Sequence, residues 1–199
     1  PYGGIEEDGV SSNFAKEYQT KETADLFMAL LMEKLSDNGR AGIVLPDSIL
    51  FGDGVKNNIK SRLLKEFNLH TIVRLPEGVF APYTSITTNL LFFNRDPQGT
   101  KEIWYYELEL PEELARFTKT NPIKRSNFDK VRKWWNNREE NEQAWLVKVE
   151  DIKNYNLDIK NPSKIDESES YTMEEIIDKM KTITKDNEEI ISKLEGLLK

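Results

Sequence analysis

The sequence has 199 residues, of which 38% are hydrophobic and 32% are charged, and its formal net charge is −7. This length allows one domain with a hydrophobic core and an appendage, and the composition is that of a folded, charge-rich protein. No run of about 18 apolar residues is present, so the sequence predicts no membrane-spanning helix. With no signal peptide visible, we expect a cytoplasmic protein.

Cysteine is absent and His70 is the only histidine. Disulfides, thiolate nucleophiles and zinc sites of the Cys/His type are therefore excluded. A Ser-His-Asp triad would have to use His70, which follows Leu69 at the start of an apparent strand. We interpret His70 as a structural residue.

The first elements are a loop, a helix and a strand. Residues 1–22 are rich in Gly, Ser, Asn and charge, and this composition predicts a loop. Apolar residues then recur at helical spacing over residues 23–35, and Asn38-Gly39 is a good helix stop. The predicted apolar face consists of Ala24, Phe27, Leu31 and Leu35, with Met28 and Leu30 alongside. The run "AGIVLP" at 41–46 is typical of a strand buried on both faces, as in a parallel sheet.

A second helix and three more strands follow. Asp53 and Gly54 precede a helical pattern whose apolar side consists of Val55, Ile59, Leu63 and Phe67. Further strands are predicted at "LHTIVRLP", "TTNLLFFNR" and "KEIWYYEL". A strand, a helix and a strand at this spacing form an α/β crossover unit, which places the core of the sheet in residues 23–110.

Residues 111–160 change in character. Between Arg116 and Arg138 basic side chains dominate, Asp129 is the only acid, and four aromatics are interleaved. Such a segment can follow a phosphate backbone or stack on bases. The candidates for contact with a DNA backbone are Lys119, Lys124, Arg125, Arg132 and Lys133. The alternative is an amphipathic helix from about Ser126, with Phe128, Val131 and Trp135 buried and the basic side chains solvated.

The C-terminal part is predicted to be an acidic linker followed by a helix from Tyr171 to Lys199. Its apolar residues alternate in steps of three and four, as in a heptad repeat with one polar core position. The core positions are Met173, Ile176, Met180, Ile183, Asn187, Ile190, Leu194 and Leu197. Ile177, Ile191 and Leu198 widen the apolar stripe. A stripe of this width suits a bundle of several helices, which predicts a partner-binding helix. The alternative is that the helix folds back on its own domain.

The chain opens with "PYGG", and five later stretches follow in an order that one protein family shares. They are "TADLFMALLMEKLSDNGRAGIVLPDSILF", "LHTIVRLPEGVFAPYTSITTNLLFFNR", "IWYYEL", "RFTKTNPIKRSNF" and "YNLDIKNP". Together they resemble the modification subunits of type I restriction-modification systems, which are DNA adenine-N6 methyltransferases. The resemblance implies an α/β fold, the C-terminal half of a Rossmann-like sheet that uses S-adenosylmethionine, followed by a helical tail. The expected domains are the methyltransferase half at 1–110, a basic and aromatic extension at 111–163, and the linker with the partner helix at 164–199.

The resemblance also implies a mechanism. Pro1 and Tyr2 match the last two residues of the family's Asn-Pro-Pro-Tyr/Phe motif, which binds an adenine extruded from the duplex. In the family, the Asn side chain and the first Pro carbonyl accept hydrogen bonds from the adenine amine, and the aromatic ring stacks on the base. S-adenosylmethionine donates the methyl group. Tyr2 is therefore the expected stacking residue, and Phe80 and Tyr83 are candidates for a wall of the base pocket.

The sequence lacks two parts of the family pattern. The Asn and first Pro of the motif do not occur, and no Gly-rich turn for S-adenosylmethionine is present, so this chain contains no cofactor-binding residue. We expect a fragment of a longer subunit that does not methylate by itself. In the family, the strand at Ala41–Leu45 lies beside the strand that carries the motif. We therefore expect Ala41–Leu45 at the edge of a small mixed sheet, with "TTNLLFFN" between it and the strand at 70–75.

The resemblance implies double-stranded DNA, a specificity subunit and a second modification subunit as partners, and it leaves the presence of a restriction subunit open. Two other functions stay open as well. The chain could be a non-catalytic assembly module, with the α/β part as scaffold and the tail as a docking helix. It could also be an unrelated α/β enzyme that uses Asp47 and Asp53 at strand ends, although Asp53 is more simply a helix N-cap.

Overall fold

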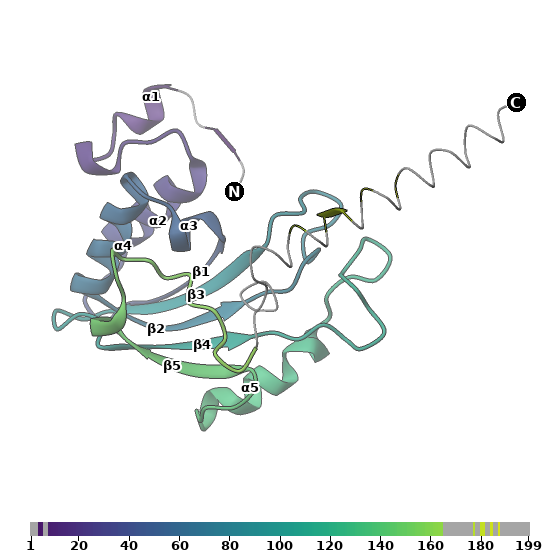
Figure 1. Ribbon diagram of the computed structural model, residues 1–199. Helices are drawn as coiled ribbons and strands as arrows, with labels where there is room; N and C mark the ends of the chain where they lie inside the picture. The colour runs from purple at the N-terminus through teal and green to yellow at the C-terminus, as the bar shows by residue number, and fades with distance from the viewer. Residues whose placement is uncertain are drawn as a thin grey trace, which may run out of the picture. The chain divides into compact units, whose positions relative to one another are not determined.

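The computed structural model describes residues 4–5 and 8–164, together with Ile177, Met180, Lys181, Thr184 and Asn187. The chain divides into two compact units, residues 1–163 and residues 164–199 (Figure 1). In the second unit the five separately described residues are helical and exposed. The Thr184 hydroxyl there donates a 2.9 Å hydrogen bond to the Met180 carbonyl one turn earlier. The other predicted core positions of the partner helix lie outside the described residues: Met173, Ile176, Ile183, Ile190, Leu194 and Leu197.

Within the described residues, one five-stranded sheet organises the first unit. The strands are β1 (Arg40–Pro46), β2 (Phe67–Arg74), β3 (Thr88–Arg95), β4 (Glu102–Glu107) and β5 (Ala144–Lys148). Their order in space is β1-β3-β2-β4-β5. β2 and β4 are parallel, and the other three neighbouring pairs are antiparallel. The predicted mixed α/β sheet, with β3 between β1 and β2, is confirmed.

β1 does not have the environment that its sequence predicts. It is an edge strand of the sheet and pairs only with β3 among the described residues, in antiparallel orientation. Only Leu45 and Pro46 of this strand are buried, and Gly42 is exposed. The prediction of burial on both faces in a parallel sheet is therefore wrong, because helices cover one face of β1 and nothing described covers the other. The prediction that Ala41–Leu45 lies at a sheet edge is confirmed.

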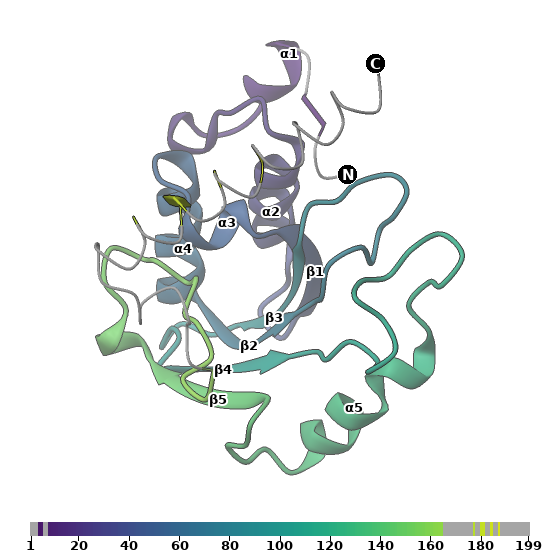
Figure 2. The same ribbon diagram turned by 45° about the vertical axis from the view of Figure 1, so that its right-hand side comes forward.

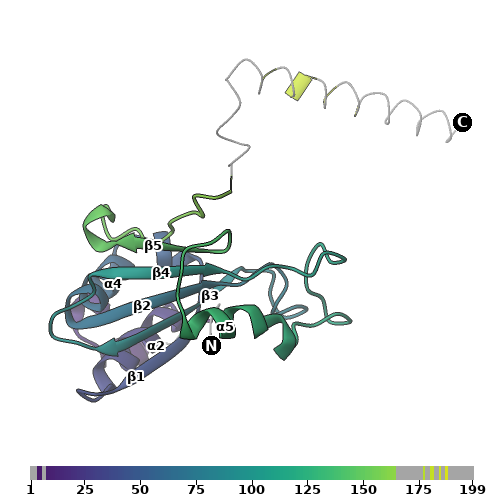
Figure 3. The same ribbon diagram turned by 90° about the horizontal axis from the view of Figure 1, so that it is seen from below.

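Helices cover the two faces of the sheet unequally. α2 (Thr23–Lys34) and α4 (Val55–Glu66) pack on one face, and the short α3 (Ser48–Phe51) lies beside them (Figure 2). α5 (Asp129–Asn136) crosses the opposite face, as the view from below shows (Figure 3). α1 (Asp8–Ser11) and a 3-10 helix (Lys16–Tyr18) occur in the segment that the sequence predicts as a loop.

The main core lies between the sheet and the pair α2 and α4. Phe67 and Phe93 meet there edge to face, with ring centroids 5.6 Å apart, and neither ring is exposed. Phe67 is the first residue of β2, not part of the preceding helix as its spacing suggests. The fully buried side chains of the two helices are Met28, Met32, Ile59 and Leu63. Phe27, predicted on the buried face of α2, is instead 45% exposed, because the buried face runs through Ala24, Met28 and Met32.

A second core forms between the sheet and α5. Its central residue is Trp134, whose ring packs 5.0 Å from Tyr106 and whose Nε1 donates a 2.9 Å hydrogen bond to the Glu139 carbonyl. The predicted helix from Ser126 is instead a 3-10 helix (Arg125–Phe128) followed by α5. This shorter helix buries Val131 and Trp134, while Phe128 and Trp135 are half-buried. The prediction that Trp135 is the buried tryptophan is therefore wrong.

Two further predictions need correction. β5 completes the sheet from outside residues 23–110, so the core of the sheet extends further along the chain than its sequence suggests. Asp53 does not cap α4, because Gly54 occupies the N-cap position with a φ of 65°, a conformation that favours glycine. Asp53 Oδ1 instead accepts a 3.1 Å hydrogen bond from the Asn57 amide.

Candidate functional site

The edge of the sheet at which β1, β2 and β4 end carries the candidate site. β1 and β2 both run opposite to β3, and β2 is parallel to β4, so the three strands end at the same edge. Residues 47–54, 75–87 and 108–124 continue from these ends, and the last two segments project side by side in Figure 2. In open α/β sheets ligands bind beyond the carboxyl ends of the strands.

Asp47, the first residue after β1, is hydrogen-bonded to the end of the loop 75–87 at the edge where β1, β2 and β4 end. The Thr87 hydroxyl donates to Asp47 Oδ2, and the Asn89 amide donates to Asp47 Oδ1 over 2.5 Å. The Asp47 N–H in turn donates to the Thr87 carbonyl over 3.0 Å. These bonds give the Asp47 carboxylate a structural role, which weakens the alternative of an enzyme that uses Asp47 and Asp53.

The loops 75–87 and 108–124 are packed against each other. The fully buried Phe117 donates its N–H to the Glu77 carbonyl over 3.0 Å. Gly78 has a φ of 81°, and a Cβ there would lie 2.0 Å from the Phe117 carbonyl oxygen, so only glycine fits. Phe80 packs against the second core, whereas Tyr83 is 92% exposed. Of the two predicted pocket aromatics, Tyr83 therefore presents its ring to solvent at this edge.

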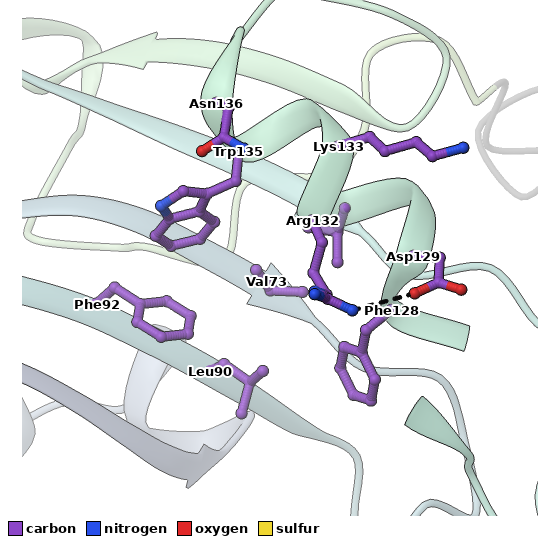
Figure 4. A pocket seen from close by; sticks show the side chains of 10 residues that line it. Val73, Leu90, Phe92, Phe128, Asp129, Arg132, Lys133, Trp135 and Asn136 are labelled. Carbon is purple, nitrogen blue, oxygen red and sulfur yellow. Dashed lines mark hydrogen bonds and ion pairs between the residues drawn. The ribbon is translucent and has the colours of Figure 1, made fainter. Parts of the chain in front are cut away.

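A groove of about 640 Å³ lies between α5 and the sheet (Figure 4). Its floor is formed by Val73, Leu90 and Phe92, and the Trp135 ring points toward Phe92 with centroids 4.8 Å apart. Arg132 lines the groove and forms a 3.3 Å ion pair with Asp129. The groove thus has an apolar floor and a charged rim, a combination that fits an aromatic or aliphatic group beside an anion.

Residues of β2 and α5 meet around His70. The Arg138 guanidinium stacks 4.6 Å from the centroid of the Trp135 ring, and the His70 ring lies edge to face with the same tryptophan at 5.9 Å. His70 Nδ1 and the Thr71 hydroxyl share a 2.8 Å hydrogen bond. Burial, together with the nearby Arg138 charge, lowers the pKa of His70 to about 4. The ring is therefore neutral near pH 7, in agreement with the structural role expected from the sequence.

All five predicted DNA-backbone residues are exposed. They come from the loop 108–124, the 3-10 helix and α5, and are Lys119, Lys124, Arg125, Arg132 and Lys133. Some neighbouring basic side chains are used internally, since Lys130 pairs with Glu109 at 2.8 Å and Arg138 stacks on Trp135. Lys133 lines the groove, and its ammonium end points away from the Trp135 and Phe92 rings (Figure 4).

Pro1 and Tyr2, which the resemblance assigns to catalysis, lie outside the described residues. The first described residues are Gly4 and Ile5, and Ile5 forms an isolated antiparallel bridge with Glu22 at the start of α2. Sequence reasoning missed the two buried lysines of α4, Lys56 and Lys60. Their spacing was the available signal, because both fall on the apolar side of the helix, one turn apart.

The mixed sheet, the helices on both faces and the loops gathered at one edge place the chain in the α/β class that binds ligands beyond its strand ends. The family model described as N-6 DNA Methylase matches residues 1–171. The chain belongs to this family.

The chain is similar to type I methylase subunits over its whole length. It is 49% identical over 207 aligned residues to the type I restriction enzyme EcoEI methylase subunit of Escherichia coli, covering 100% of this chain and 42% of that protein. It is also 49% identical to a modification subunit assigned to a type I restriction enzyme of Vibrio vulnificus, with a TM-score of 0.78 over 85% of this chain and 38% of that one. A chain from a study of complex assembly and conformational transition in the type I R-M system is 38% identical, with a TM-score of 0.78, and covers 100% of this chain and 43% of that one. The chain thus spans less than half the length of these relatives.

Among the residues that the structure describes, no helix has the length and apolar character needed to cross a bilayer.

The first prediction concerns His70, which as the only histidine gives one imidazole signal in a proton NMR titration. We expect a midpoint near pH 4. Arg138→Gln should raise it toward the ordinary value of 6.5, because one cause of the shift, the positive charge, is removed while burial remains. The exposed Lys133→Gln is the matched control and should leave the midpoint unchanged.

The direction of the resulting pH dependence follows from linkage. The folded-state pKa of His70 lies below its ordinary value of 6.5, so the unfolded chain takes up the proton first as the pH falls. The contribution of His70 to stability is therefore complete above pH 6.5 and is lost between pH 6.5 and about 4. A wild-type midpoint near 6.5 would contradict the buried, neutral ring.

Proposed function

We propose that this chain forms the base-binding part of a site-specific DNA adenine-N6 methyltransferase, the modification subunit of a type I restriction-modification system. The observation that carries the proposal is the 49% identity to a type I methylase subunit over the whole chain, together with the family match at residues 1–171. The gathering of loops at the carboxyl ends of β1, β2 and β4 supports it, because ligands of α/β sheets bind there.

The chemistry requires a base held flat outside the duplex. The exocyclic amine of adenine is a weak nucleophile because its lone pair is delocalised into the ring. Hydrogen-bond acceptors at the amine let its nitrogen rehybridise toward the methyl donor, and an aromatic side chain holds the extruded ring. In our proposal Tyr2 stacks on the adenine, and the Asn-Pro that precedes it in the family supplies the acceptors. Tyr83 offers an exposed ring on the loop that follows β2.

S-adenosylmethionine is the proposed methyl donor. The residues of this chain do not fit a complete site for it, because the sequence contains no Gly-rich strand-turn-helix that could receive the cofactor. The chain spans 42% of the E. coli relative, and we propose that the cofactor turn lies in the remainder of such a subunit. The 199-residue chain would then contribute base and DNA contacts and would not methylate alone.

Double-stranded DNA is the proposed substrate, and the exposed basic residues near α5 are its proposed contacts. Lys119, Lys124, Arg125 and Lys133 have no ion pair within the described part of the chain, so their charges are available to phosphates. The net charge of −7 argues against indiscriminate binding, and sequence reading is assigned to a separate specificity subunit. Contact would therefore be local, confined to these exposed side chains.

We also propose that residues 164–199 dock onto the specificity subunit, so that two modification subunits flank one sequence reader. Two observations support this role. The segment forms a compact unit separate from residues 1–163, and its described apolar side chains Ile177 and Met180 are 46% and 64% exposed. A docking function without catalysis would need only this second unit.

Substitution of Tyr2 tests the proposed stacking role. In the full-length subunit assembled with its specificity subunit, Tyr2→Ala should slow adenine methylation roughly 5- to 150-fold, the equivalent of the 1–3 kcal/mol of base stacking. Affinity for S-adenosylmethionine should stay nearly unchanged, because the stacking ring does not hold the cofactor. Tyr2→Phe keeps the ring and serves as the matched control. Equal rates for Tyr2→Ala and the wild type would rule out stacking.

The salt dependence of DNA binding tests the basic residues. The triple variant Lys124→Gln, Arg125→Gln and Lys133→Gln should bind DNA more weakly in the same complex. The slope of log affinity against log salt should become shallower by about 0.9 for each phosphate that the variant no longer neutralises. A control with the same change in net charge replaces the exposed Lys16, Lys34 and Lys101 by Gln. Identical slopes for the two triple variants would show that Lys124, Arg125 and Lys133 do not contact the DNA backbone.

A further inference from the structure

The segment that follows Tyr2 is attached to the first turn of α2. The Thr23 N–H donates a 3.2 Å hydrogen bond to the Gly4 carbonyl, and Ile5 bridges Glu22. The approach is close, since a Cβ on Gly4 would lie 2.8 Å from the Thr23 hydroxyl oxygen. The start of α2 therefore fixes where the chain lies two residues after Tyr2.

The start of α2 is held in turn by Lys56 of α4. The Lys56 ammonium lies 2.8 Å from Asp25 Oδ2 and 2.5 Å from Glu22 Oε2. Lys56 and Asp25 are buried, with exposed fractions of 8% and 2%. Burial lowers the pKa of Lys56, but its hydrogen bonds to the two carboxylates outweigh this and raise the pKa above its ordinary value. The lysine thus stays charged and keeps both contacts near neutral pH.

One turn further along α4, Lys60 holds the loop that follows β1. Its ammonium donates to the carbonyls of Leu50 and Gly52 over 3.0 and 2.8 Å. Gly52 also packs directly on the Lys56 stem, where a Cβ would lie 2.3 Å from Cδ. Lys56 and Lys60 therefore connect α4 to two segments: the one that leaves the motif and the one that leaves β1.

We propose that Lys56, through Asp25 and Glu22, is a positioning residue for the Pro1-Tyr2 motif. It holds the first turn of α2, and this turn holds Gly4 and Ile5, which follow Tyr2 by two and three residues. Lys56 touches neither base nor cofactor in this account. The inference rests on the proposed function, because it presupposes that Tyr2 stacks on the extruded adenine.

The same two helices provide a matched control. Arg62 of α4 also pairs with α2, through Glu33 at 3.3 Å. This contact lies near the C-terminal end of α2, far along the helix from Gly4, and the Glu33 side chain is 66% exposed. Removing the Arg62 charge breaks an α2–α4 ion pair without touching the first turn of α2. Comparing variants of the two ion pairs therefore distinguishes an effect on the position of the motif from a general loss of α2–α4 contact.

The test uses the full-length subunit assembled with its specificity subunit. The variants are Lys56→Met, Lys56→Arg, Asp25→Asn and Arg62→Met. Each is assayed for the single-turnover methylation rate, the KM for DNA, and the fluorescence of 2-aminopurine placed at the target adenine. Exchange of the Thr23 amide hydrogen is followed in parallel, because this N–H bonds to Gly4.

We expect Lys56→Met to lower the methylation rate at least about tenfold with little change in KM, since a displacement near 1 Å costs up to about a hundredfold. The 2-aminopurine signal should also change, because the extruded base is held less well, and the Thr23 amide should exchange faster. Lys56→Arg should restore most of the rate, and Arg62→Met should match the wild type. Asp25→Asn preserves the shape of the side chain and gives the same test if Lys56→Met does not fold.

The positioning role is overturned if folded Lys56→Met or Asp25→Asn methylates at the rate of Arg62→Met. It is also overturned if the rate falls but Lys56→Arg does not restore it and the Thr23 amide is unaffected. Tyr2→Ala distinguishes failure of the positioning role of Lys56 from failure of the stacking role of Tyr2. If Tyr2→Ala is slow while the Lys56 and Asp25 variants are normal, only the positioning role fails. If Tyr2→Ala is normal, the stacking role under "Proposed function" fails.

Discussion

The architecture depends on β3, which lies antiparallel between β1 and β2 and pairs with both. Val44 and Val73 meet Leu90 from the two sides, so the register is fixed on both edges of β3. Because β3 runs opposite to its neighbours, the loop 75–87 returns along the edge at which β1 and β2 end. The bonds of Thr87 and Asn89 to Asp47 then attach the end of this loop to β1. The strand direction and this small polar cluster together place the candidate site at one edge of the sheet.

The two faces of the sheet have different consequences for function. On the face covered by α2 and α4, the buried lysines Lys56 and Lys60 hold the first turn of α2 and the segment that follows β1. Buried charges are retained only where partners satisfy them, and here two carboxylates and two carbonyls do so. On the opposite face, α5 covers part of the sheet and leaves an apolar groove above Leu90 and Phe92. One face thus fixes loop positions, while the other presents basic and aromatic side chains.

Local patterns in the sequence predicted α2, α4 and the first four strands, because their apolar spacing is set by helix and strand geometry. The central place of β3 followed from the family resemblance, since strand order depends on contacts between distant residues. The same limit explains the error on β1, since a short apolar run looks alike at the edge and in the centre of a sheet. β5 was missed because its five residues, Ala144–Lys148, lie in the segment assigned to the basic and aromatic extension.

The tryptophan error and the missed lysines have more local causes. The prediction placed Phe128 in the same helix as Trp135, but Phe128 lies in the preceding 3-10 helix, and the buried pair on α5 is Val131 and Trp134, three residues apart on one face. Lys56 and Lys60 were missed because a charged residue on an apolar helix face gives no indication of its partner. Glu22 and Asp25 lie 34 and 31 residues from Lys56 in the sequence. Only the folded chain brings these charges together.

The identity of the methylated base tests the central claim most directly. The full-length subunit of our proposal, assembled with the proposed specificity subunit, would be incubated with double-stranded DNA and isotopically labelled S-adenosylmethionine, and the nucleosides would be analysed by mass spectrometry. The account predicts label in N6-methyladenine only, and none when the 199-residue chain replaces the full subunit. Label in a methylated cytosine, or methylation by the 199-residue chain alone, would contradict it.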